Sequence, residues 1–285
     1  MVHIKGLEGT FDTVVSKYEK MRPGYAPELY QTIFDYAPIG EDSRVVEVGS
    51  GSGQATLPVL QKDCELVSVE YGENFSKALR EKFKDYPKFT VITGKFEDAE
   101  LPKDSFDLVF SATAFHWVPE EIGYRKVFEI LKSGGVFARF ANRPYTCKNE
   151  PELAAKIDSY YAEYYNKFHK KESKPRIEFT EDKAIELANI AGKYGFTDIR
   201  HAMFFRERVF TAKEYLELLG TYSDHIAIEE TIRNEFFAKI ENAINEAGGT
   251  ITITDTMDLE LARKALKARS DYLCNRQFNV IMTLF

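Results

Sequence analysis

RVVEVGSGSG, residues 44–53, is the segment from which the fold of this chain can be predicted. Its three valines form an apolar, β-branched run too short for a helix, which is typical of a parallel strand buried on both faces. Gly49, Gly51 and Gly53 follow directly, and residues 54–62 can form a helix. Glycine permits positive φ and lets a ligand approach the main chain without meeting a Cβ. The order strand, glycine turn and helix predicts a nucleotide-type site in an open α/β sheet.

Two acids narrow the choice of ligand. Glu47 stands two places before Gly49, where a carboxylate would repel a pyrophosphate and attract an ammonium or sulfonium group. Residues 64–70 (CELVSVE) read as a second strand that ends in Glu70, 21 residues after Gly49. An acid about 20 residues past the glycines binds ribose hydroxyls in such folds, because a carboxylate accepts both O–H donors. Together, the acids predict a nucleoside that carries an amino acid.

Further segments follow in an order that is specific as a set. They are GKFEDAELP (94–102), FDLVFSATAFHW (106–117) and LKSGGVF (131–137). With the glycine turn and Glu70, they resemble the class I S-adenosylmethionine-dependent methyltransferases, in the small-molecule, type 11 branch that includes trans-aconitate methyltransferase-like proteins. The resemblance implies an α/β fold: a Rossmann-like, seven-stranded, mostly parallel sheet whose last strand is antiparallel, with helices on both faces and a helical cap.

The sequence pattern places seven strands along the chain. They are expected at 45–48, 64–70, 89–93, 108–110, 136–140, about 198–208 and 250–256. Three regions are expected: an N-terminal helical lid (1–36), an S-adenosylmethionine-binding core (37–142), and a region of helical cap insertions with the last two strands and a C-terminal tail (143–285). The first region is read either as a lid or as helices packed on the sheet. The tail from residue 259 is apolar enough to pack on the domain or on a partner chain.

The resemblance implies S-adenosylmethionine as the cofactor. The cofactor-binding residues that it implies are Tyr18, Arg22, Glu47, Gly49, Ser50, Gly51, Gly53, Glu70, Tyr71, Phe96, Glu97 and Ser111. Relatives often carry an acid at the place of Lys95, so the backbone of Phe96 and the carboxylate of Glu97 are expected to contact the adenine instead. Arg22 is expected to face the methionine carboxylate or an anionic substrate.

The acceptor is expected to lie beyond the fourth strand, because ligands of open sheets bind outside the carboxyl ends of the strands. The substrate-binding residues are predicted to be Tyr25, His116, Trp117 and Tyr222. His116 is the candidate catalytic residue, since a histidine of ordinary pKa can remove a proton near neutral pH. The alternative is that His116 only hydrogen-bonds in the wall, because a carboxylate acceptor is already ionised and needs no base.

Composition excludes several other classes. The net charge of −7 argues against a nucleic-acid substrate, which requires clustered Lys and Arg. No apolar run of about 18 residues and no signal-peptide core are present, so a cytoplasmic protein without membrane contact is expected. Three scattered cysteines and five scattered histidines offer no metal spacing. The expected partner is a small-molecule substrate, and the chain is expected to be a monomer or a homodimer.

The predicted function is therefore methyl transfer from S-adenosylmethionine to a small molecule, a carboxylic acid being one acceptor class. Two alternatives stay open. One is an NAD(P)-dependent oxidoreductase on a Rossmann sheet, which Glu47 and the G-x-G-x-G spacing disfavour because dinucleotide sites use G-x-G-x-x-G. The other is a non-catalytic cofactor-binding protein.

Overall fold

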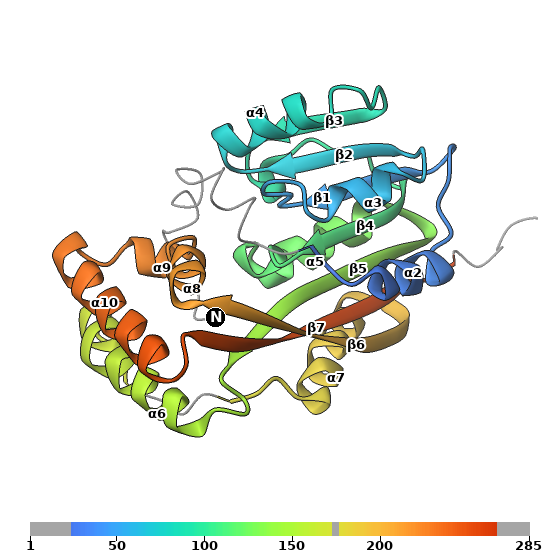
Figure 1. Cartoon of the computed structure of the whole chain (residues 1–285). Coiled ribbons are helices and arrows are strands. Elements are labelled where there is room, and N and C mark those ends of the chain that lie inside the picture. Colours follow the sequence, from blue (N-terminus) through green and yellow to red (C-terminus); the bar gives the residue numbers. More distant parts are fainter. Residues whose placement is uncertain (1–23, 173–176, 267–285) are drawn as a thin grey trace, which may run out of the picture.

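The computed structural model describes residues 24–172 and 177–266, which contain one seven-stranded sheet (Figure 1). Its strands are β1 (Arg44–Val48), β2 (Glu65–Glu70), β3 (Phe89–Thr93), β4 (Phe106–Ala112), β5 (Leu131–Thr146), β6 (Phe196–Thr211) and β7 (Thr250–Lys264). The order across the sheet is β3-β2-β1-β4-β5-β7-β6, and β7 is antiparallel to both of its neighbours while the remaining pairs are parallel. The predicted Rossmann-like sheet with an antiparallel last strand is confirmed.

Helices cover both faces of this sheet. The described α-helices are α2 (Pro27–Tyr36), α3 (Thr56–Leu60), α4 (Glu73–Lys82), α5 (Glu120–Ile130), α6 (Pro151–Tyr160), α7 (Glu181–Asn189), α8 (Ala212–Leu219), α9 (Ser223–Ile226) and α10 (Glu230–Glu246). Helices α2, α3 and α4 pack on the face that carries Val45, and α5 packs on the face that carries Val46 and Val48. Because side chains alternate along a strand, the valine run of β1 contributes to both faces of the hydrophobic core of the sheet.

Short helices complete the connections. They are the 3₁₀ helices η2 (Phe96–Asp98), η3 (Phe115–Trp117) and η5 (Ile190–Tyr194), and the π-helix η4 (Tyr161–Asn166). Among the described helices, none combines the length and the apolar character that crossing a bilayer requires.

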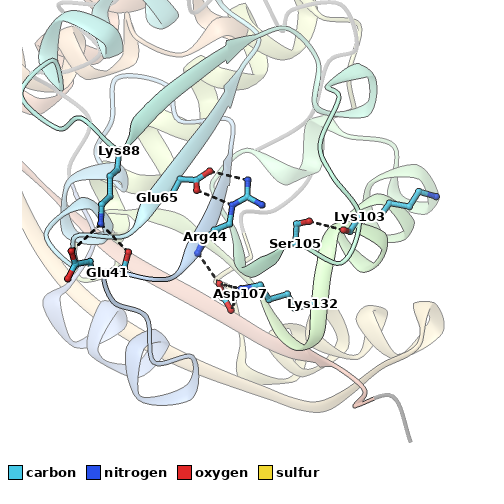
Figure 2. Close-up of polar contacts among 8 residues, drawn as sticks. All are labelled: Glu41, Arg44, Glu65, Lys88, Lys103, Ser105, Asp107 and Lys132. Atoms are coloured by element: carbon cyan, nitrogen blue, oxygen red, sulfur yellow. Dashed lines mark hydrogen bonds and ion pairs between the residues drawn. The ribbon is translucent and has the colours of Figure 1, made fainter. Parts of the chain in front are cut away.

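The amino ends of the strands are joined by charged side chains (Figure 2). The backbone N–H of Arg44 donates to Asp107 Oδ2 at 2.9 Å, and Lys132 Nζ donates to the same oxygen at 2.8 Å. The Arg44 guanidinium pairs with Glu65, with 3.0 Å between Nε and Oε2. These contacts tie β1 to β2, β4 and β5 at the edge opposite the glycine turn, and so help to set the register on which the site depends.

The strands β5, β6 and β7 are longer than predicted. Their antiparallel pairing continues to Thr146↔Ile253 and Thr211↔Thr250, beyond the carboxyl ends of β1 and β4. The predictions of 136–140, 198–208 and 250–256 were too short, because polar residues interrupt the apolar ones along these strands and no continuous apolar run marks their full length. The extended strands form an arm that reaches toward the helices α6, α8, α9 and α10 (Figure 1).

These four helices and η4 enclose a second hydrophobic core. Ile157, Leu218, Phe236 and Ile240 are among its buried residues. Helix α7 instead lies on the sheet, where the carbonyl oxygen of Leu187 accepts a hydrogen bond from Arg139 at 3.2 Å. We refer below to α6, η4, α8, α9 and α10 as the cap.

Candidate functional site

A cavity of about 220 Å³ lies beyond the carboxyl ends of β1, β2 and β4. At one end it is lined by the glycine turn and by the segments that follow β2 and β3. At the other end, its wall comes from the segment after β4, the far part of β5, β6 and the cap. The lining residues at this second end include Tyr25, Thr113, His116, Trp117, Asn142, Pro144, Arg208, Leu218 and Tyr222. We call the two ends the glycine end and the cap end.

The glycine turn excludes side chains for geometric reasons. Gly49 has φ +73°, and a Cβ on it would lie 2.4 Å from the Cβ of Ala114. Gly53 has φ +82°, and a Cβ there would lie 2.7 Å from the ring of Phe83. Gly51 has φ +54°. The turn is therefore a bare main-chain cradle, with Gly49, Ser50 and Gly51 on the cavity wall while Gly53 packs against α4 and is absent from the lining.

Glu70 joins two loops at the glycine end. One carboxylate oxygen accepts the backbone N–H of Gly51 at 2.8 Å, and the other accepts that of Gly72 at 2.8 Å. The side chain is buried but lines the cavity. Because a carboxylate oxygen has two lone pairs, this arrangement orients Glu70 and is compatible with further donors such as hydroxyl groups.

Glu47 lies beneath the turn and does not line the cavity. Its side chain is fully buried on the same side of β1 as Val45, and Oε2 accepts a hydrogen bond from Thr56 Oγ1 at 2.7 Å. Burial raises the pKa of this carboxyl to about 7. Among the described residues, Oε1 has no hydrogen-bond partner. A buried acid with an unsatisfied oxygen below the cradle favours a cationic ligand above it.

Ser111 also does not face the cavity. It is fully buried on β4, and its hydroxyl donates to the carbonyl oxygen of Val48 at 2.8 Å. The hydroxyl of Ser50 is bonded to that of Ser68 at 2.6 Å, which holds the turn against β2. Both serines therefore support the main chain of the turn, and Ser50 alone of the two contributes to the lining.

The residues predicted to enclose an adenine gather beside Glu70. Tyr71, Phe96 and Glu97 all line the cavity. Phe96 is buried with its ring against Phe115, whereas Tyr71 is 48% exposed. The ammonium of Lys95 lies 5.9 Å from the centre of the Tyr71 ring. This part of the wall combines an exposed aromatic face with polar backbone.

The cap end brings together residues that are far apart in sequence. The hydroxyl of Tyr25 is 2.6 Å from Thr113 Oγ1, which also accepts the backbone N–H of Asn142 at 3.1 Å. His116 and Trp117 lie side by side with their ring centres 5.3 Å apart. All the predicted substrate-side residues that the structure describes, including Tyr222, line the same cavity. Tyr18 and Arg22 lie outside the described residues.

Sequence reasoning missed several residues of the wall. Thr113 and Asn142 lie three and two residues beyond the predicted strands 108–110 and 136–140, so the carboxyl-end rule contains a signal for both. Arg208 carried no such signal, because its place depends on the pairing of β6 with β7, two elements distant in sequence. Within residues 24–172 and 177–266, no group of three or more His, Cys, Asp or Glu side chains is arranged to bind a metal ion.

Comparison with known proteins agrees with this geometry. Residues 46–138 match the profile of a methyltransferase domain family. A methyltransferase of Schizosaccharomyces pombe is 23% identical over 239 residues, covering 82% of this chain and 87% of that protein. A methyltransferase of Geobacillus is 30% identical over 146 residues, covering 47% of this chain and 68% of that protein.

Solved structures share the fold. A type II methyltransferase from Anaeromyxobacter dehalogenans superposes with a TM-score of 0.62 at 22% identity, covering 86% of this chain and 99% of that one. A phosphoethanolamine N-methyltransferase of Haemonchus contortus, solved with S-adenosylhomocysteine, gives a TM-score of 0.54 at 15% identity, covering 93% of this chain and 61% of that one. The sheet order and the glycine cradle define a class I methyltransferase.

The chain belongs to the S-adenosylmethionine-dependent methyltransferases, in the type 11 branch. The resemblance inferred from the sequence is thus confirmed, and S-adenosylmethionine is the cofactor of the family. The relatives and solved structures described above are methyltransferases, which does not favour the oxidoreductase or the non-catalytic alternative.

Proposed function

We propose that this methyltransferase acts on a small-molecule acceptor, and that the acceptor belongs to the carboxylic acids. The small-molecule acceptor is supported by the cavity, because this one space runs from the glycine cradle and Glu70 to Tyr25, His116 and Tyr222. Donor and acceptor can share this space, since alignment of the two reactants accounts for much of the rate of a methyl transfer. The second part rests on the resemblance to the trans-aconitate methyltransferase-like proteins.

The residues of the glycine end fit the cofactor. When bound, S-adenosylmethionine supplies a methyl group on a positively charged sulfur. In our proposal, Glu70 accepts hydroxyl donors of the ribose, while Tyr71 and Phe96 enclose the adenine. The main chain of Gly49, Ser50 and Gly51 on the cavity wall receives the methionine part. The buried carboxyl of Glu47, with an unpaired oxygen, places negative charge below the same turn.

The residues of the cap end would bind and orient the acceptor. The hydrogen-bonded pair Tyr25 and Thr113 fixes one side of the wall, and Trp117 offers an aromatic surface beside it. We assign His116, which is exposed on the wall, as the group that takes a proton from an acceptor with a hydroxyl or amine nucleophile. A carboxylate acceptor needs no proton removal, and His116 then acts only through hydrogen bonding.

Replacement of Glu70 by Ala tests the donor site. We expect Glu70→Ala to weaken S-adenosylhomocysteine binding at least roughly tenfold, because charge-assisted hydrogen bonds contribute about 1.5 to 3 kcal/mol each. Calorimetric titration measures the affinity. Glu65→Ala is the matched control, since it removes the same side chain from the other end of β2 and should leave affinity unchanged.

A second measurement separates this proposal from dinucleotide chemistry. S-adenosylhomocysteine should raise the melting temperature of the protein, since a ligand that binds only the native state stabilises it by mass action. A nicotinamide dinucleotide should leave it unchanged. Stabilisation by the dinucleotide alone would refute the assignment. Transfer of labelled methyl groups to small acids, with and without His116→Ala, then tests the acceptor class and the need for a base.

A further inference from the structure

Arg208 is a charged residue of the cap end that the mechanism above does not use. It lies on β6 and lines the cavity, although its side chain is only 15% exposed. Its guanidinium binds Asp255 through two hydrogen bonds, with Nε 2.5 Å from Oδ2 and Nη2 2.9 Å from Oδ1. The side chain is therefore held in one orientation before any ligand arrives.

The charge around Arg208 is not balanced locally. Asp255 is fully buried and also accepts a hydrogen bond from Arg206 Nη2 at 3.1 Å and one from Asn142 Nδ2 at 3.0 Å. Two guanidinium groups thus share a single carboxylate. The Nε of Arg206 is buried without a hydrogen-bond partner among the described residues. The cluster therefore carries more positive than negative charge beside the cavity, where the Arg208 side chain is 15% exposed and the Arg206 side chain 32%.

The hydrogen bonds to Asp255 leave one edge of the Arg208 guanidinium available. Asp255 occupies the side edge formed by Nε and Nη2, and no described residue accepts a hydrogen bond from Nη1. A guanidinium has five N–H donors, and the two terminal nitrogens form a fork that fits both oxygens of a carboxylate or phosphate. An anchored guanidinium with an open fork is preorganised to bind an oxyanion.

The remaining charged residues of the described wall lie elsewhere. Glu70, Lys95 and Glu97 all belong to the glycine end, so Arg208 is the charged residue that the described part of the chain places at the cap end. An acceptor without an oxyanion would leave the open fork of Arg208 without an acceptor for its N–H groups in the cavity, which is less favourable. We propose that Arg208 binds an oxyanion of the acceptor, and that the acceptor is therefore an anion. This inference rests on the proposed function.

The anchored oxyanion is distinct from the methylated atom in this proposal. Oxygens that accept charge-assisted hydrogen bonds from a guanidinium are poorer nucleophiles, because their lone pairs are engaged. Arg208 thus acts in recognition, and the methylated atom lies elsewhere in the same acceptor. A dicarboxylate satisfies both requirements, as does a phosphate ester that carries a second nucleophile.

The test uses the full chain saturated with S-adenosylhomocysteine. Calorimetry measures the binding of glutarate, of glycerol 3-phosphate and of neutral glutaramide to the wild type and to the Arg208→Gln and Arg208→Lys variants. Arg200→Gln is the matched control, because Arg200 lies on the same strand and pairs with Asp198 but does not line the cavity.

We expect at least one anion to bind the wild type more tightly than glutaramide. Arg208→Gln should lower that affinity about tenfold or more, Arg208→Lys should lower it less because the charge remains, and Arg200→Gln should leave it unchanged. A preference for glutarate over the phosphate ester, or the reverse, identifies the oxyanion. If both anions bind no better than glutaramide, or if all variants bind them equally, the inference is wrong.

The same titrations separate this inference from the proposed function. Absence of S-adenosylhomocysteine binding to the wild type would refute the function itself. Retained binding of that compound by Arg208→Gln shows that the variant is folded, so a loss of anion affinity then belongs to Arg208. If Arg208→Gln fails to fold, the comparison of anions with glutaramide on the wild type and on Arg208→Lys decides the inference.

Discussion

Gly49 illustrates at the scale of one residue how a missing side chain creates the site. Its backbone has positive φ and its Cα faces Ala114, so that even a methyl group would overlap with that neighbour. L-residues other than glycine rarely adopt such a conformation, and here they would meet a steric clash as well. The glycine spacing in the sequence was therefore sufficient to predict the turn.

Glu47 leads to a pH-dependent prediction. Its pKa rises from 4.5 to about 7 in the folded protein because the carboxyl is buried. The native state thus holds a proton that the unfolded chain releases, so the contribution of this group to stability is present below pH 4.5 and is lost as the pH rises through 7. The shift corresponds to roughly 3 kcal/mol at most.

Unfolding in urea of the wild type and of Glu47→Gln measures this effect. The wild type should lose stability relative to the variant between about pH 5 and about pH 8, since Gln carries no titrating proton. A difference that stays constant with pH would contradict the buried, protonated state. Binding of S-adenosylhomocysteine to the wild type should also tighten as the pH rises through 7, because the ionised carboxylate below the turn then attracts the ligand's ammonium group.

At the scale of elements, the parallel strands were predicted well and the antiparallel ones were not. Strand β3 was predicted at its observed bounds, and β1 and β2 to within one residue. These strands are bounded by turn residues and carry β-branched side chains that mark them locally. The bounds of β6 and β7 instead depend on mutual pairing over 14 or more residues, which no local pattern encodes.

Asp107 is the element-scale feature that we expect to matter for stability alone. It accepts hydrogen bonds from the Arg44 backbone and from Lys132 at the edge opposite the cavity (Figure 2). Asp107→Asn should lower the free energy of unfolding by about 1 to 2 kcal/mol, because the substitution removes the negative charge that pairs with Lys132 and one of the two accepting oxygens. Chemical denaturation measures the loss, and S-adenosylhomocysteine affinity should not change.

A matched control is Glu81→Gln. Glu81, in the last turn of α4, forms an exposed pair with Lys84, and such pairs contribute little. An equal loss of stability in both variants would show that Asp107 has no special role in holding the strand ends together.

At the scale of the whole molecule, the two ends of the site are positioned by two separate hydrophobic cores. The sheet core positions the glycine end, whereas the cap core positions Leu218 and Tyr222 at the cap end. The glycine end could be predicted residue by residue because its motifs are local. Arg208 could not be assigned to the site in the same way, since its place depends on the register between β6 and β7.

The two cores should respond differently to the same substitution. Ile240 is fully buried in the cap, and Ile130 is buried against the sheet. Ile240→Ala should cost about 2 to 5 kcal/mol and accelerate amide exchange mainly in α6, α8 and α10. Ile130→Ala should instead accelerate exchange in the sheet and weaken S-adenosylhomocysteine binding. Exchange monitored by mass spectrometry distinguishes these outcomes, and uniform acceleration by both variants would contradict two separate cores.

The position of β7 between β5 and β6 has a consequence for biosynthesis. Among the described strands, β6 pairs only with β7, which follows it by about 40 residues in the chain. During translation, the strands that carry the glycine turn can pair before β7, the neighbour of β6, has been synthesised. The nascent polypeptide can therefore acquire its donor cradle first, and Arg208 reaches the cavity only after the ribosome has released the residues up to Lys264.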